Sequence, residues 1–192
     1  MKRRSLLPMG GGAFETPFDM LAGCHARIRM FIDLAARITT EPAPSEQVAE
    51  AASRLALYFG TALPLHEEDE EKTLHLAMAQ YAISDIDALF ARLEAEHRTI
   101  EAILHRLLPR WRILARTPDV LIGESGVLGE GAAALAAAFM PHLEMEENEL
   151  YPLARRCLPD DVQARMLRAM RGRREPMIDR LHSLHENQEI RS

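Results

Sequence analysis

Residues 141–152 read PHLEMEENELYP, so one histidine is followed closely by four carboxylates. Residues 64–76 read PLHEEDEEKTLHL and repeat the same theme. When the two stretches are aligned on their histidines, the glutamates four positions later coincide as well. The matched pairs are His66 with His142 and Glu70 with Glu146. Residues four apart lie on one face of an α-helix, so each His-x-x-x-Glu pair can converge on one point.

A second echo links two other histidines. When His25 is aligned with His97, Ile28 falls on Ile100. Both histidines lie among apolar residues at helical spacing, which indicates that they face a core. The sequence therefore predicts two helical hairpins of related pattern. In each hairpin the first helix carries one inward histidine, and the second carries His-x-x-x-Glu.

Apolar periodicity predicts four long amphipathic helices. They are expected over residues 17–40, about 45–80, about 85–109 and 132–157. Thr16 is the expected N-cap of the first helix, and Ser84 or Asp85 that of the third. A kink or an irregular turn is expected at Pro64 in the second helix, and the third should end near Pro109.

The connections complete the predicted fold. Residues 116–131 contain Pro118 and four glycines, a composition typical of a long, loosely structured connection. A short extra helix is expected to open at residues 159–161 and to end by Gly172, and the charged remainder should fray or form a short helix near residues 176–186. Four long helices with mostly short connections predict an all-α fold, an antiparallel up-down four-helix bundle with a short extra C-terminal helix.

Length and composition favour one domain. The chain has 192 residues, and 47% of them are apolar, which is enough for a substantial core. We divide it into a flexible N-terminal lead-in (1–13), a bundle domain (14–171) and a charged C-terminal tail (172–192). The first residues faintly resemble an export signal, but a proline and three glycines interrupt the apolar run, so we reject that interpretation. No uncharged apolar run approaches about 18 residues, so no transmembrane helix is predicted.

Charge and cysteine content narrow the function classes. A net charge of −6 argues against nucleic acid as a partner. Two cysteines without a CxxC spacing argue against a disulfide framework and against a cysteine-based zinc or redox motif. We expect a protein of the reducing cytoplasm with no membrane partner. A homodimer or a protein partner is left open.

Four imidazoles and two carboxylates are predicted to meet in the core. The six residues are His25, His66, Glu70, His97, His142 and Glu146. Buried imidazoles and carboxylates without partners are costly, and a metal ion removes that cost. Imidazole suits iron, copper, zinc and nickel, and carboxylates add oxygen donors that can bridge two ions. Four nitrogens and two bridging carboxylates fit a pair of irons better than one structural zinc, which takes four ligands.

These motifs resemble the hemerythrin family, and within it the HHE cation-binding branch, over about residues 14–157. The resemblance rests on the two inward histidines and on His-x-x-x-Glu-Glu written twice, the second copy continuing to Leu-Tyr-Pro at Pro152. It implies a non-haem di-iron centre bridged by Glu70 and Glu146, often with an oxo or hydroxo group as well.

The match departs from the oxygen-carrying hemerythrins. Those have a second histidine one turn after the third-helix ligand, where this chain has Glu101, and they have His-x-x-x-x-Asp where this chain has His-x-x-x-Glu. The pattern is closer to relatives that repair iron–sulfur clusters or sense iron. The repair relatives also carry an N-terminal cysteine-bearing domain, for which we find no room here.

Several further residues are secondary candidates. Glu101 is a candidate seventh ligand or an acceptor that orients His97, with a solvated helix residue as the equal alternative. Glu67 could swing to an iron, although solvation is the preferred interpretation. Tyr58 and Tyr151 could approach the site, and packing is the preferred interpretation for both.

Three function classes follow from these residues. The favoured one is a binder or sensor of oxygen, nitric oxide or peroxide at a di-iron centre. The second is a di-iron enzyme that removes peroxide or nitric oxide, or one that delivers iron during iron–sulfur cluster repair. The third is an interaction module in which the metal only holds the helices together.

Overall fold

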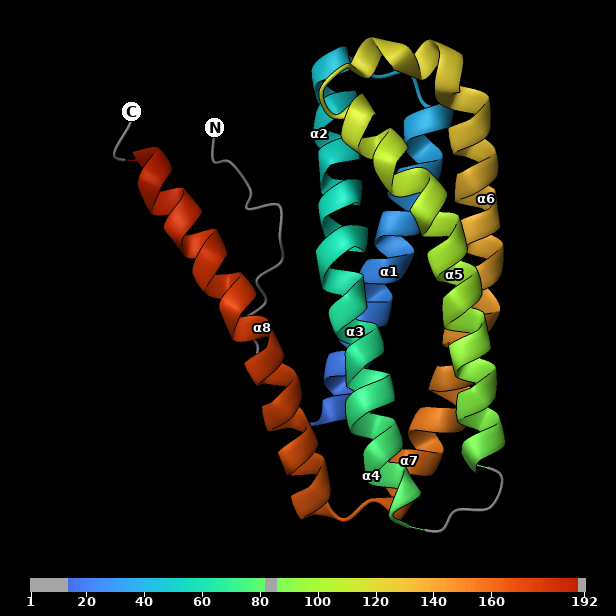
Figure 1. The fold of residues 1–192 in the computed structure, drawn as a ribbon, viewed down its shortest axis with the longest axis vertical. Coiled ribbons are helices and arrows are strands. Elements are labelled where there is room, and N and C mark those ends of the chain that lie inside the picture. The colour runs from blue at the N-terminus through green and yellow to red at the C-terminus, as the bar shows by residue number, and fades with distance from the viewer. Residues whose placement is uncertain (1–13, 82–85, 190–192) are drawn as a thin grey trace.

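The computed structural model describes residues 14–81 and 86–189, with the side chains of the last helix described as far as residue 175. The described residues are almost entirely helical and contain no strand, so the predicted all-α class is confirmed. Four long segments lie side by side along the long axis, and the lower part of the last helix packs against one side of them (Figure 1). The segments are α1 (Pro17–Thr40); α2 (Ser45–Leu57), α3 (Leu63–Asp69) and α4 (His75–Ala79); α5 (Ile86–Leu114); and α6 (Leu121–Met145) with α7 (Tyr151–Cys157); the last helix is α8 (Asp160–Glu189).

Helix α1 begins where the sequence predicts. The Thr16 hydroxyl accepts a hydrogen bond from the Asp19 amide at 3.1 Å, and the Asp19 carboxylate accepts one from the Thr16 amide at 3.0 Å. This capping box satisfies two backbone donors that a helix start leaves free, and Pro17 has no donor to satisfy. The expected caps of the third helix, Ser84 and Asp85, lie outside the described residues.

Wide π-helical turns interrupt the second and fourth segments. They are η1 (Tyr58–Ala62), η2 (Glu70–Leu74) and η4 (Glu146–Leu150). Four residues of α-helix turn through about 400°, so positions spaced by four drift about 40° per step. A π turn, with its i to i+5 hydrogen bonds, removes that drift. The irregularity expected at Pro64 is η1, which lies just before it.

The π turns keep one long line of side chains pointing inward in each segment. Both lines use the spacing 4, 3, 4, 4, 4, and the turns η2 and η4 fall at equivalent positions. The buried line of the second segment is Phe59, Leu63, His66, Glu70, Leu74 and Met78, and that of the fourth is Leu135, Phe139, His142, Glu146, Leu150 and Ala154. All six pairs keep the alignment that places His66 on His142, so the echo in the sequence extends along the whole packed face.

Two expected helix boundaries are wrong. Helix α5 continues through Pro109 to Leu114, and the gain is the burial of Trp111 and Leu114 in the core. Residues 116–131 are not a loose connection, because a short 3-10 turn, η3 (Pro118–Val120), leads directly into α6.

One glycine of α6, Gly131, has a packing role that composition alone does not reveal. A Cβ on Gly131 would lie 2.5 Å from Cδ2 of Leu107, so the missing side chain lets α5 and α6 approach closely. Gly123 and Gly126 have no side-chain neighbour within 4 Å and lie on the open face of the helix.

The C-terminal helix is longer than expected. Helix α8 runs without interruption past Gly172, so the predicted end at that residue is wrong. Arg173 and Arg174 form ion pairs with the buried carboxylate of Asp69 at 2.8 and 2.6 Å. These contacts hold α8 against the second segment and explain why the helix does not stop at the glycine.

One helical stretch, Pro118–Cys157, is long and apolar enough to cross a membrane on length and composition alone. Core helices pass the same test, so this is weak evidence. Much of the apolar character comes from the alanines at 132–138, and the stretch carries the buried polar residues His142 and Glu146.

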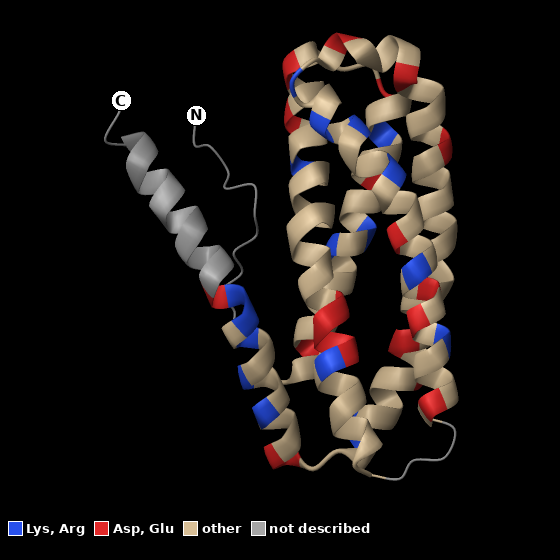
Figure 2. Ribbon diagram, in the orientation of Figure 1, with Lys and Arg blue, Asp and Glu red and all other residues tan. Residues whose placement is uncertain are grey.

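The core consists of two apolar clusters with a polar layer between them. One cluster is built around Phe59, Trp111 and Phe139, and the other around Phe18 and Phe90. Along each segment the inward histidine marks the change from one cluster to the other. Acidic residues gather at this level on facing segments (Figure 2).

Candidate metal centre

The six predicted site residues come together in the polar layer. Each of the four segments supplies one histidine, and the π turns η2 and η4 supply the two glutamates. Their exposed fractions are His25 0%, His66 2%, Glu70 1%, His97 4%, His142 1% and Glu146 0%. Among the described residues, these six ionisable side chains are buried together, and neither glutamate forms an ion pair with a lysine or an arginine.

The donor atoms form two groups that share both glutamates. One group is His25, His66, Glu70 and Glu146, and the other is His97, His142, Glu70 and Glu146; within each group the atoms lie within 4.8 Å of one another. The two Glu146 oxygens lie 3.2 Å from His25 Nε2 and 3.3 Å from His142 Nε2. Each oxygen thus faces a different group, which is the arrangement of a bridging carboxylate.

Glu70 spans the two groups in a related way. Its Oε2 lies 3.7 Å from His66 Nε2 and 3.5 Å from His97 Nε2. Two donors each about 2.1 Å from one ion lie about 3 Å apart at a right angle and about 3.4 Å apart at a tetrahedral angle. The Glu146 separations of 3.2 and 3.3 Å fall within this range, and the two Glu70 separations are slightly longer.

Several of these atoms have no hydrogen-bond partner. The buried atoms without one include Nε2 of His66 and of His97, Oε2 of Glu70 and both carboxylate oxygens of Glu146. Leaving such groups unpaired away from water costs several kcal/mol. Their convergence in the polar layer fits a site for metal cations.

Three of the four histidines are held neutral by their surroundings. Burial lowers the pKa of the His66 imidazole to about 3, and burial also lowers the pKa values of His25 and His142. A neutral imidazole has a free nitrogen lone pair, which metal ligation requires. His97 differs: burial lowers its pKa, but hydrogen bonds and charge from Glu70 and Glu71 outweigh burial and raise it to about 9.

The two glutamates have pKa values driven apart. Burial, followed by the negative charge of Glu70, raises the pKa of Glu146 well above its usual range. Burial also acts to raise the pKa of Glu70, but the nearby histidines, His66 first, outweigh it and lower the value. Two carboxylates this close cannot both ionise without a cation, so the pair favours a positive charge between them.

A ring of outer carboxylates holds the other nitrogen of three histidines. Glu147 accepts from His25 Nδ1 at 2.8 Å, and Arg29 forks onto both oxygens of that glutamate at 2.8 Å. Glu71 lies 3.0 Å from His97 Nδ1. Contacts of this kind fix the imidazole tautomer and leave Nε2 free for a metal.

Glu96 completes this ring for His142, at 2.9 Å from Nδ1, and Arg92 holds Glu96 in turn at 2.8 Å. Sequence reasoning did not assign this role to Glu71 or Glu147, whose side chains are also 42% and 33% exposed to water. It did not identify Glu96 at all. The available signal was the position of Glu96 next to His97, four residues after Arg92.

The fourth histidine lacks such a partner. Nδ1 of His66 is buried and without a hydrogen bond. In the alignment that places His25 on His97, the counterpart of Glu96 in the first segment is Cys24. The outer carboxylate ring is therefore incomplete on one side.

The secondary candidates lie outside the two donor groups. Glu101 is exposed, and the acceptor that orients His97 is Glu71. Glu67 is half-buried beside the site, and burial followed by repulsion from neighbouring glutamates raises its pKa to about 7. Tyr58 packs against Phe31 with ring centroids 4.0 Å apart, as the packing interpretation predicts. Tyr151 behaves differently, because its hydroxyl reaches two of the donor residues.

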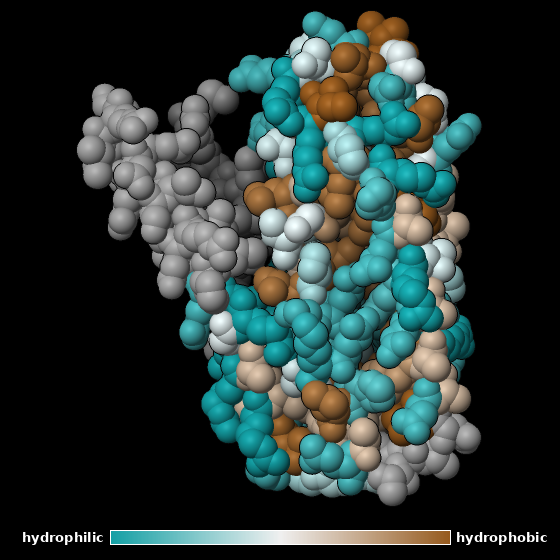
Figure 3. Space-filling model, in the orientation of Figure 1, coloured by the Kyte–Doolittle hydropathy of each residue, from teal (hydrophilic) through white to brown (hydrophobic). Residues whose placement is uncertain are grey.

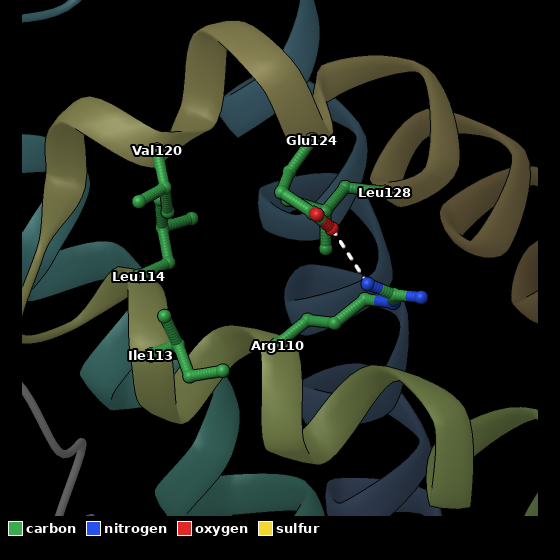
Figure 4. Close-up of a pocket in the computed structure, with 6 residues that line it drawn as sticks. All are labelled: Arg110, Ile113, Leu114, Val120, Glu124 and Leu128. Atoms are coloured by element: carbon green, nitrogen blue, oxygen red, sulfur yellow. Dashed lines mark hydrogen bonds and ion pairs between the residues drawn. The ribbon is translucent and has the colours of Figure 1, made fainter.

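A small cavity lies at the other end of the molecule and is separate from the centre. It has a volume of about 130 Å³. It is lined by Arg110, Ile113, Leu114, Val120, Glu124 and Leu128, and an ion pair of 2.7 Å between Arg110 and Glu124 closes one side (Figure 4). Apolar residues also appear at this end of the surface in Figure 3. None of the donor residues lines this cavity.

The fold and the site define a class: helical proteins with a buried histidine–carboxylate centre for metal cations. The chain matches the family model described as "Hemerythrin HHE cation binding domain" over residues 16–154. The chain belongs to this family. It is also similar to an uncharacterized protein of Haemophilus influenzae, with 23% identity over 175 residues, covering 88% of this chain and 96% of that protein.

Proposed function

We propose that this protein binds two iron ions and uses the centre to bind or sense oxygen, nitric oxide or peroxide in the cytoplasm. We also propose that the four long segments form the antiparallel up-down bundle expected for the family, and that this bundle holds the centre. The observation that carries the first proposal is the pair of donor groups that share Glu70 and Glu146. A single shared carboxylate would fit one bound ion with a second carboxylate group nearby. Two shared carboxylates fit a pair of ions that both carboxylates bridge.

The side chains would hold the pair as follows. His25 and His66 bind one ion and His97 and His142 the other, each through Nε2, while the outer carboxylates keep three of the Nδ1 atoms occupied. Iron at this position supplies a redox-active centre that binds small ligands. The two apolar clusters on either side exclude bulk water and so favour an uncharged diatomic ligand over a large polar substrate.

Ligand count supports a binding role. Two octahedral ions with no shared donor atom need about twelve donor atoms. The six residues offer four imidazole nitrogens and at most four carboxylate oxygens, one of which, Glu70 Oε1, accepts a hydrogen bond from Tyr151. The shortfall leaves coordination positions that a small exogenous ligand can occupy.

The test is iron content per chain together with absorption spectra of anaerobically purified protein, before and after air. We expect about two irons per chain and new near-ultraviolet bands after oxidation. His142→Ala should lose iron, whereas the exposed His105→Ala should retain it. Wild-type protein that takes up no iron under these conditions would refute the proposal.

Binding and turnover are then separated with the loaded protein. Adding oxygen, nitric oxide or peroxide to the reduced form should change the spectrum stoichiometrically and without sustained consumption. Steady consumption of peroxide or nitric oxide would instead identify an enzyme. Absence of any response, with loss of helical structure on iron removal, would leave a metal that only stabilises the fold.

A further inference from the structure

Tyr151 is placed inside the donor set rather than beside it. It is the first residue of α7, directly after the π turn that carries Glu146, and it is 5% exposed. Its phenolic oxygen lies 2.9 Å from His25 Nε2 and hydrogen-bonds to Glu70 Oε1. Both contacts are to donor residues of one group, and His25 Nε2 is the atom that would face the metal.

The spacing suits a ligand better than an outer partner. An outer partner of a metal-bound histidine contacts the nitrogen that points away from the metal, as Glu147 contacts His25 Nδ1 at 2.8 Å. The Tyr151 oxygen is instead on the Nε2 side. A separation of 2.9 Å is close to the roughly 3 Å expected for two cis donors on one ion. The ring also stacks on His25, with centroids 5.3 Å apart, which fixes its direction.

We infer that Tyr151 is a seventh protein ligand, whose phenolate oxygen binds the ion held by His25 and His66. The inference rests on the proposed function. In the metal-free protein the phenol is protonated and donates to Glu70. When ferric iron binds, the phenolic O–H bond breaks, an iron–oxygen bond forms and the proton leaves to solvent. No electron is transferred in this step.

The second ion has no matching donor. In the alignment that places His66 on His142, the counterpart of Tyr151 is His75, which is half-buried and stacks on Phe90 with centroids 4.1 Å apart. The ion held by His97 and His142 therefore keeps four protein ligands, against five for its neighbour. The two ions therefore differ in the number of protein ligands. Exogenous ligands bind at the ion with four protein ligands, which has more open coordination positions.

The test is a visible spectrum of the ferric protein, because phenolate bound to ferric iron gives an intense charge-transfer band that histidine and carboxylate ligands do not give. Iron content is measured on the same samples. Tyr151→Phe removes only the hydroxyl. Tyr58→Phe is the matched control, since Tyr58 is also buried and its hydroxyl contacts the Cys24 carbonyl at 3.4 Å, outside the donor groups.

We expect the band in wild-type protein and in Tyr58→Phe, and its loss in Tyr151→Phe with iron still bound. Resonance Raman excitation within the band should show phenolate ring modes that vanish in the same variant. Two irons in wild type without a phenolate band, or a band that persists in Tyr151→Phe, would overturn the inference and leave the proposed function intact. Absence of iron in wild type would remove both.

Discussion

Replacing Asp69 by alanine should detach α8 from the second segment. The Asp69 carboxylate is fully buried and pairs with Arg173 at 2.8 Å and Arg174 at 2.6 Å. The truncation removes the carboxylate that neutralises both guanidinium groups and leaves them with only neutral partners, Thr73 for Arg173 and the Met170 carbonyl for Arg174. Breaking a buried pair by removing one partner costs about 3–5 kcal/mol. The arginine side chains are 24% and 15% exposed, so water recovers part of their solvation. We therefore expect the lower end of the range, about 3 kcal/mol.

The assay is urea and thermal unfolding of the variant in the presence of a chelator, so that bound metal does not contribute. For a chain of this size about 3 kcal/mol corresponds to a fall of roughly 6–12 °C in Tm. Arg174→Ala should cost less than Asp69→Ala, because Arg173 still neutralises the carboxylate. The control is Asp161→Ala, which removes an exposed pair with Arg165 one helical turn away and should leave Tm unchanged. If Asp69→Ala and Asp161→Ala unfold at the same temperature, the buried clamp does not hold α8, and the reasoning fails.

Three further predictions concern the centre and the helix packing. Glu147→Gln should weaken iron binding about 10- to 100-fold in a chelator competition, because His25 loses its charged acceptor. The control is the exposed Glu144→Gln, which should bind iron as the wild type does. Equal iron affinities of the two variants would contradict the role of the outer carboxylates. Gly131→Ala should destabilise the protein by about 1–3 kcal/mol in urea unfolding, because the added Cβ meets the buried Leu107. Gly126→Ala should instead stabilise the protein by up to about 1 kcal/mol, because alanine has the higher helix propensity. A change of the same sign in both variants would refute the packing argument. Removing iron should lower Tm in proportion to the lost binding free energy. It should also raise the rate of amide hydrogen exchange more in the polar layer than in the two apolar clusters. An equal increase in all three regions would show that the metal does not bind the polar layer selectively.

The parts of the site that the sequence predicted share a short-range cause. His-x-x-x-Glu spacing is a local property of a helix, and the apolar neighbours of His25 and His97 define which face is buried. The structure brings these residues together as expected. Their service as ligands to iron stays a prediction, as do the division of the chain at residue 171 and the identity of any partner.

The parts that could not be predicted depend on tertiary contacts. Pro109 and the glycines of 116–131 favour a break locally, but burial of Trp111 and the close approach at Gly131 outweigh that preference. Glu96 and Asp69 look like ordinary charged residues in a solvated run. Their partners, His142 and Arg173, are 46 and 104 positions away in sequence, and no local pattern encodes such pairs.

The sharing of the glutamates has a consequence for how the two halves of the chain depend on each other. Each hairpin supplies both histidines of one donor group, yet each group also includes the glutamate of the opposite hairpin. Neither hairpin contains all the residues of a donor group, and each hairpin supplies the glutamate that the other hairpin lacks. That reciprocity is the defining property of an isologous interface between two identical subunits. The centre therefore has the symmetry of a dimer interface within one polypeptide, and the unequal pair Tyr151 and His75 is a position at which the two halves differ.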